Sequence, residues 1–202
     1  MLGIFQGKKR EYNELILKGL LFGPKTTTQI AEYIYLNRKA QVKPKQINQN
    51  EVKKIISIIS REKSRLEELK TKEYIYQHGN LWFLSPKGMG VALTFYSVME
   101  VYPHVKPFIS SIIKEFENAI KQNPVFATLI EEKALKLAKK YMESQEFLQL
   151  LKDLAEELIR QGMDLDKTSS RDFLGMLAGK FLILLLPKIV MGHTIPKEGV
   201  RN

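Results

Sequence analysis

KEYIYQHGNLWFLSPKG, from Lys72 to Gly88, is the stretch of this 202-residue chain that decides the fold. It holds two short runs rich in aromatic and branched side chains, which are residue types that favour strands. Gly79 lies between the two runs, where its conformational freedom suits a hairpin turn. Ser85 and Pro86 then match the N-cap and the first residue of a helix. Because a hairpin alone is only marginally stable in water, we expect residues 74–84 to pack on a neighbouring helix.

Helical patterns surround this hairpin on both sides. Apolar residues recur at helical spacing in each of them, and Gly23-Pro24 ends the first pattern. The expected helices cover residues 11–22, about 26–37, 48 or 50 to about 70, and 87 to about 102. Residues 38–49 are polar, basic and interrupted by Pro44, which predicts a loop. A hairpin that follows the third helix would project beside it as a wing.

The third expected helix has two distinct faces when its residues are placed at 100° intervals. The apolar arc holds Val52, Ile55, Ile56, Ile58, Ile59, Leu66 and Leu69. The opposite arc holds Lys53, Ser57, Ser60, Arg61 and Ser64, with Lys54 and Arg65 at its edge. The outward face is therefore expected to combine short hydroxyl side chains with basic ones.

The positive charge of the chain is concentrated in its first half. The formal net charge is +10, and residues 1–90 carry 17 Lys and Arg against 8 Asp and Glu, a net of +9. Residues 91–202 carry 15 against 14, a net of +1. Such a concentration is typical of a module that binds a polyanion. A basic face without any partner is the alternative interpretation.

The second half reads as a series of amphipathic helices. Helices are expected from about Pro103, from Asn123-Pro124 onward, over 145–162 and over 173–191, with a linker at 163–172. The last of these is the most apolar stretch, but Lys180, Pro187 and Lys188 interrupt it before it reaches the length of a membrane span. We therefore expect a buried or dimer-forming helix and no membrane association. The expected fold class is mainly α with one β-hairpin, divided into residues 1–102 and an all-α helical domain, 103–202.

The chain lacks the residues that several kinds of catalytic and metal site require. The chain has no cysteine, and its three histidines are far apart in the sequence. The adjacent pairs Glu131-Glu132 and Glu156-Glu157 do not share a helix face. We expect no enzyme activity, no cofactor and no metal site. The absence of cysteine and of a secretory signal favours a cytoplasmic protein.

The ordered set of motifs in residues 11–100 resembles winged helix-turn-helix DNA-binding proteins, in particular MarR-like and PadR-like regulators. Thr26-Thr-Thr-Gln-Ile-Ala-Glu resembles their second helix, and Ile47-Asn-Gln-Asn-Glu-Val-Lys-Lys-Ile-Ile resembles the start of their recognition helix. The most specific part is Leu66-Glu-Glu-Leu-Lys-Thr-Lys-Glu-Tyr-Ile-Tyr, followed by Leu84-Ser-Pro-Lys-Gly. The chain departs from the family in its long basic segment 38–49 and in the length of its third helix. Residues 103–202 resemble no family that we can name.

The resemblance implies that a helix enters the DNA major groove and that the wing lies near the backbone or minor groove. Basic side chains on that helix would reach base edges or phosphates, and the basic loop would add phosphate contacts. The expected DNA-binding residues are Arg38, Lys39, Lys43, Lys45, Lys53, Lys54, Ser57, Ser60, Arg61, Ser64, Arg65, His78 and Asn80. Tyr74, Tyr76 and Trp82 are expected to pack within the hairpin and not to stack on bases.

The function expected from these patterns is a transcriptional regulator that binds double-stranded DNA as a homodimer. One alternative is a winged-helix protein-interaction module in a replication, segregation or transcription assembly, with a protein partner bound through the C-terminal helices. Another is a ligand-responsive sensor with a pocket in those helices. The aromatic residues that would line such a pocket are Phe116, Phe126, Tyr141 and Phe147.

Overall fold

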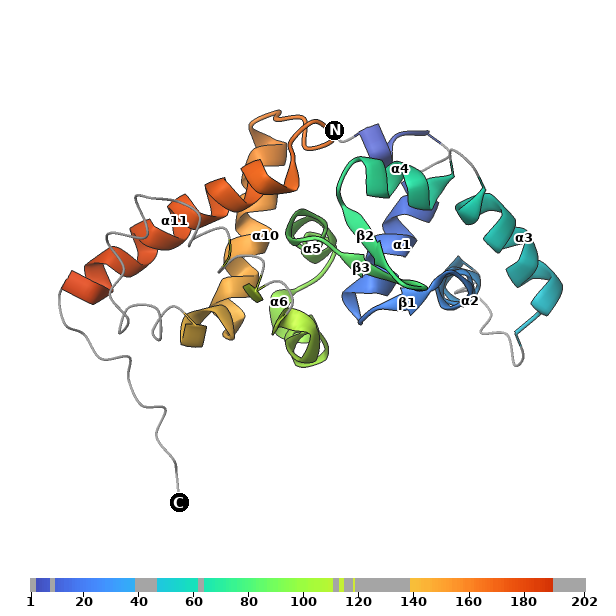
Figure 1. The fold of residues 1–202 in the computed structure, drawn as a ribbon, viewed down its shortest axis with the longest axis horizontal. Coiled ribbons are helices and arrows are strands. Elements are labelled where there is room, and N and C mark those ends of the chain that lie inside the picture. Colours follow the sequence, from blue (N-terminus) through green and yellow to red (C-terminus); the bar gives the residue numbers. More distant parts are fainter. Residues whose placement is uncertain are drawn as a thin grey trace, which may run out of the picture.

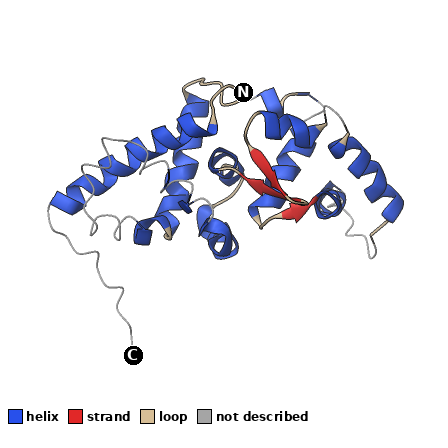
Figure 2. Ribbon diagram, viewed as in Figure 1, coloured by secondary structure: helices blue, strands red, loops and turns tan. Residues whose placement is uncertain are grey.

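The computed structural model of the 202-residue chain is mainly helical, with one small three-stranded antiparallel sheet (Figures 1 and 2). The residues that the structure describes are 3–7, 10–38, 47–61, 64–110, 113–114, 118 and 139–190. The coarse expectation of a mainly α fold that contains a hairpin is confirmed. The helix expected after Asn123-Pro124 falls for the most part outside the described residues.

Local sequence signals explain where the first elements begin and end. The first four elements are η1 (Gly3–Phe5), α1 (Arg10–Leu21), β1 (Lys25–Thr26) and α2 (Thr27–Arg38). The start of α2 is held by reciprocal bonds, because Thr26 N donates to Gln29 Oε1 over 2.9 Å and Gln29 N donates to Thr26 Oγ1 over 3.2 Å. This capping box satisfies backbone donors that a helix start leaves without partners.

The expected long third helix is wrong, because the structure breaks it into α3 (Gln49–Ser60) and α4 (Arg65–Thr71). The backbone is extended at Arg61, with ψ 161°, and again at Ser64, with ψ −178°. A sequence signal for this break exists, because Ser64 and Glu67 have the spacing of a capping box. The apolar residues on either side of polar residues 60–65 fit the same helical arc, and this agreement favoured one long helix.

The expected hairpin is confirmed, and it belongs to a three-stranded sheet. β2 (Ile75–His78) pairs antiparallel with β3 (Leu81–Leu84), and Gly79 in the two-residue loop has a φ of +60°, which a glycine adopts without strain. β1 pairs with the other edge of β3, giving the order β1-β3-β2. The sequence did not reveal β1, since two residues are too few to show strand periodicity. As expected, the hairpin adjoins the preceding helix, where Tyr74 N donates to Leu69 O over 2.9 Å.

The helix after the hairpin begins as expected and ends earlier. Ser85 caps α5 (Pro86–Leu93) by accepting from Gly88 N over 3.0 Å, and Pro86 is its first residue. The expected helix to about Tyr102 is wrong, because α5 stops at Leu93 and α6 (Val98–Val105) begins after the extended Ser97. Gly88 allows a close approach, because a Cβ there would lie 1.8 Å from Tyr74 O.

The remaining elements complete the described part of the second half. They are η3 (Lys106–Phe108), α10 (Gln145–Arg160) and α11 (Ser170–Val190). The expected helix from about Pro103 is wrong at its start, since Pro103 lies inside α6. The expected helices 145–162 and 173–191 correspond to α10 and α11. Ser169 caps the start of α11, because its Oγ accepts from Asp172 N over 3.0 Å.

One hydrophobic cluster runs through both halves of the chain. Buried side chains of α1, α2, α3 and α4 belong to the same cluster as those of α5, α10 and α11. In Figure 1, α3 lies at one end of the long axis and α11 at the other, with α1, the sheet and α5 between them. The face of α3 that points away from this core is therefore remote from α11.

A junction centred on the Asp166 carboxylate ties the two halves together. Its side chain is 9% exposed and belongs to the loop between α10 and α11. Oδ2 accepts from Ile4 N over 3.1 Å and from Lys72 Nζ over 2.8 Å, and Oδ1 accepts from Tyr74 Oη over 2.9 Å. One carboxylate thus joins the N-terminal segment, the base of the hairpin and the second half of the chain.

Lys87 extends this junction from α5. Its side chain is fully buried, and its Nζ donates to the carbonyl oxygens of Lys72, Leu165 and Thr168. The ammonium group also lies 4.4 Å from the centre of the Tyr74 ring. Burial lowers the pKa of Lys87 to about 8, which the carboxylates of Glu73 and Asp166 oppose. The same loop is therefore fastened to the base of the hairpin a second time.

Candidate nucleic-acid interface

Helix α3 has one face buried in the core and one face exposed to solvent. Asn48 fixes its start by accepting from Asn50 N over 3.0 Å and Glu51 N over 3.3 Å. Val52, Ile55 and Ile59 are buried in the core. These three side chains therefore anchor the helix, and Lys53, Lys54 and Ile58 between them are exposed.

Two exposed cations lie on the outward side of α3, Lys53 within the helix and Arg61 at its C-cap. Lys53 and Arg61 form no ion pair within the residues that the structure describes. Lys54 is also exposed, but its Nζ lies 2.9 Å from Glu51 Oε1. Lys53 and Arg61 are thus the predicted contacts of α3 that are best able to meet a phosphate or a base edge.

The three predicted serines do not share one environment. Ser57 is half-buried on α3, and the Ser60 hydroxyl is exposed but donates to Ile56 O over 2.7 Å. Ser64 is only 4% exposed, and its hydroxyl has no hydrogen-bond partner among the described residues. The expected common face of Ser57, Ser60 and Ser64 is therefore wrong, because the break after Ser60 turns Ser64 into the core.

Two other predicted cations are held by the protein itself. Arg38 Nε lies 2.8 Å from Glu11 Oε1, and its guanidinium is 4.6 Å from the centre of the Tyr12 ring. The hydrogen bond to Glu11 raises the pKa of Arg38. Arg65 Nη1 lies 3.1 Å from Glu68 Oε2, and both side chains are largely covered. Binding a phosphate would require these two arginines to share or leave an existing carboxylate partner.

The loop between α2 and α3 holds the other predicted contacts. Lys39, Lys43 and Lys45 lie outside the described residues. They remain predictions from the charge of the sequence.

The tip of the hairpin is open to solvent. His78 and Asn80 are exposed, and Gln77 Nε2 donates to Gly79 O over 3.1 Å. Two of the hairpin aromatics serve packing, as expected, because Tyr74 is fully buried and the Trp82 ring nitrogen donates to Thr27 Oγ1 over 3.0 Å. The tip therefore offers two short polar side chains on a supported strand pair.

One outward residue of α3 was missed by sequence reasoning. Ile58 belongs to the expected buried arc, but it is 44% exposed. The arc was too broad, since four isoleucines crowd residues 55–59 and a single helix cannot bury them all on one side. The signal available in the sequence was the position of Ile58 four residues after Lys54 and three before Arg61.

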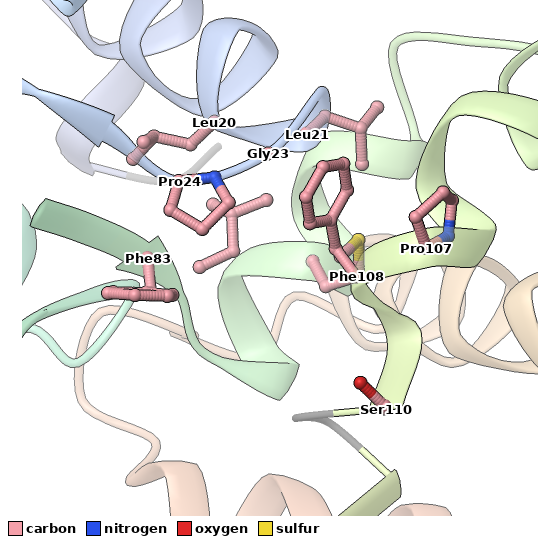
Figure 3. A pocket seen from close by; sticks show the side chains of 10 residues that line it. Leu20, Leu21, Gly23, Pro24, Phe83, Pro107, Phe108 and Ser110 are labelled. Carbon is pink, nitrogen blue, oxygen red and sulfur yellow. The ribbon is translucent and has the colours of Figure 1, made fainter.

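A cavity of about 200 Å³ is lined by residues from the end of α1, from β3, from α5 and from the segment after α6, and by none from α3 (Figure 3). Figure 3 shows Pro24, Phe83 and Phe108 reaching it from three separate segments. The lining is mainly apolar, and a cavity of this size holds about one small ring compound. This cavity is not the pocket expected in the C-terminal helices.

Two of the four aromatic residues expected to line a pocket in the C-terminal helices are among the described residues. Tyr141 and Phe147 both contact Phe181 edge to face, with ring centres 5.5 and 6.2 Å apart. These contacts belong to the core between α10 and α11. Phe116 and Phe126 lie outside the described residues.

Searches for other kinds of site and for relatives gave no positive result. The described residues hold no group of three or more potential metal ligands. Among the same residues, no helix has the length and apolar character to cross a membrane. Comparison of the chain with models of known protein families, with curated proteins and with solved structures finds no match.

Proposed function

We propose that the chain binds double-stranded DNA through the outward face of α3 and the tip of the β2–β3 hairpin. The predicted winged helix-turn-helix would place α3 in the major groove, which is wide enough for one helix. Lys53 and Arg61 would contact phosphates or base edges, and His78 and Asn80 would lie close to the backbone. Gene regulation is the role that best fits such a module.

The observation that carries this proposal is the arrangement of charge on α3. Buried Val52, Ile55 and Ile59 anchor one side of the helix. Lys53 and Arg61 are exposed away from that side, and neither has a carboxylate partner among the described residues. Exposed cations on an anchored helix attract a polyanion without prior loss of an internal ion pair. The net charge of +9 in residues 1–90 adds a long-range attraction.

A homodimer formed through the second half is part of the same proposal. On α11, Ile183 and Leu184 are 71% and 44% exposed, and a Cβ added to Gly175 or Gly179 would meet nothing within 4 Å. Gly175, Gly179 and Ile183 are spaced four residues apart, so they form one open strip on α11 that is suited to a second copy of the chain. Helix-turn-helix dimers bind paired half-sites, so a dimer would double the contacts with DNA.

Binding of labelled duplexes at several salt concentrations tests the proposal. If each protomer neutralises ~3–5 phosphates, the plot of log affinity against log salt should have a slope of roughly −5 to −9 for the dimer. The duplex should first be selected from a random pool by the full chain. A flat salt response would refute DNA binding and favour the protein-interaction module.

The 200 Å³ cavity favours a second candidate function, a ligand-responsive sensor. Met89 lines this cavity and is 3% exposed, whereas Met163 is a distant methionine in a loop and is 42% exposed. Titration with toluene, followed through the NMR signals of the methionine methyl groups, should shift Met89 and leave Met163 unchanged. Equal or absent shifts would reject the cavity as a ligand site.

A further inference from the structure

Ile58 stands apart from the other branched residues of α3. It is 44% exposed, whereas Val52, Ile55 and Ile59 are between 0 and 6% exposed. A single exposed apolar side chain is common on protein surfaces. This one, however, lies between Lys54 and Arg61 on one side of the helix, because residues three and four apart are neighbours there.

The other outward groups near Ile58 are largely engaged within the chain. Lys54 is paired with Glu51, and the Ser60 hydroxyl donates to Ile56 O. Ile58 adds little to the core, and a β-branched residue is a weaker helix former than alanine at an exposed position. Folding alone therefore gives no reason for an isoleucine at this place.

We propose that Ile58 contacts thymine methyl groups in the major groove and so helps to select the DNA sequence. This inference rests on the DNA binding proposed above. Thymine is the base that presents a 5-methyl group in the major groove, and apolar side chains are the groups that contact it. Lys53 and Arg61 would hold the helix on the duplex, and Ile58 would distinguish A·T from G·C pairs.

The size of the effect follows from the apolar surface that the contact removes from water. Covering one methyl group changes an affinity by about fourfold. Replacing thymine by deoxyuridine removes only that methyl group from the major groove. The selected duplex, synthesised with either base, therefore isolates the proposed contact.

The experiment measures the affinity of the wild-type chain, Ile58→Ala, Ile58→Val and Met99→Ala for both duplexes. Met99 is 73% exposed on α6 and serves as a matched apolar control outside α3. Wild type and Met99→Ala should bind the thymine duplex about fourfold or more tightly than the deoxyuridine duplex. Ile58→Ala should bind both equally, and Ile58→Val should retain most of the preference.

The outcomes separate this inference from the proposed function. If wild type binds duplex DNA but ignores the thymine methyl group, the role of Ile58 is refuted while DNA binding stands. The same holds if Ile58→Ala keeps the full thymine preference. If wild type binds neither duplex, the proposed function fails and this inference fails with it. Because Ile58 is exposed, each variant should melt at the wild-type temperature.

Discussion

Asp166→Asn should lower the stability of the whole chain, since it discharges the carboxylate that joins three segments. In the wild type, Oδ2 accepts from Ile4 N and Lys72 Nζ, and Oδ1 accepts from Tyr74 Oη. An asparagine fits the same space but keeps one oxygen and no charge. Hydrogen bonds to charged groups contribute ~1.5–3 kcal/mol each and neutral ones ~0.5–1.5. Weakening two such bonds should cost about 2–3 kcal/mol.

A urea titration followed by circular dichroism measures this loss. With a denaturant slope of about 2–3 kcal/mol per molar, the midpoint should fall by about 1 M. Asp164→Asn is the matched control in the same loop, because Lys167 lies 3.3 Å from Asp164, both side chains are well exposed, and asparagine keeps the oxygen that accepts from Asp166 N. Exposed pairs contribute ~0–1 kcal/mol, so the control should stay near wild type. Equal midpoints for the two variants would refute the structural importance of the junction.

Three further predictions concern a close backbone approach, the buried lysine and the open face of α11. Gly88→Ala should not fold, because its Cβ would lie 1.8 Å from Tyr74 O, whereas Gly175→Ala should keep or raise the melting temperature in open space. Burial lowers the pKa of Lys87 to about 8, so between pH 8 and 10.5 the unfolded chain binds more protons than the folded one. The free energy of unfolding of wild type, relative to Lys87→Met, should therefore rise across that range by up to about 3 kcal/mol. Ile183→Lys should shift sedimentation toward a monomer, and an unchanged profile would argue against a dimer through α11.

Signals confined to a few neighbouring residues predicted the local structure well. Ser85-Pro86, Gly79 and the runs of aromatic and branched residues on either side of it were sufficient to place the hairpin and the start of the helix that follows. Such features depend on caps, turn conformations and side-chain type, all of which act within about four residues.

Errors arose where tertiary packing decides between local alternatives. The apolar residues Val52 to Ile59 and Leu66 to Leu69 fall on one helical arc, but residues 60–65 between them are all polar, and the expectation of one long helix passed over that gap. The break at Arg61–Ser64 turns Ser64 into the core, and Ile58 is exposed because the apolar arc of α3 is broader than the face it buries. Of the predicted basic contacts that the structure describes, Lys53 and Arg61 are the best candidates. Arg38 is paired with Glu11 and Arg65 with Glu68, and only the structure reveals that these side chains meet.

The most direct test of the central claim compares two double variants with the same loss of charge. Lys53→Ala with Arg61→Ala removes the exposed cations of α3 and its C-cap that have no ion pair among the described residues, and Lys167→Ala with Arg171→Ala removes two exposed cations of the second half. If α3 is the DNA-binding helix, the first variant should lose about 30-fold or more in affinity for the selected duplex at constant salt. The second should remain within about twofold of wild type, since screening limits distant charges. Equal affinities for the two variants would contradict the placement of DNA on α3.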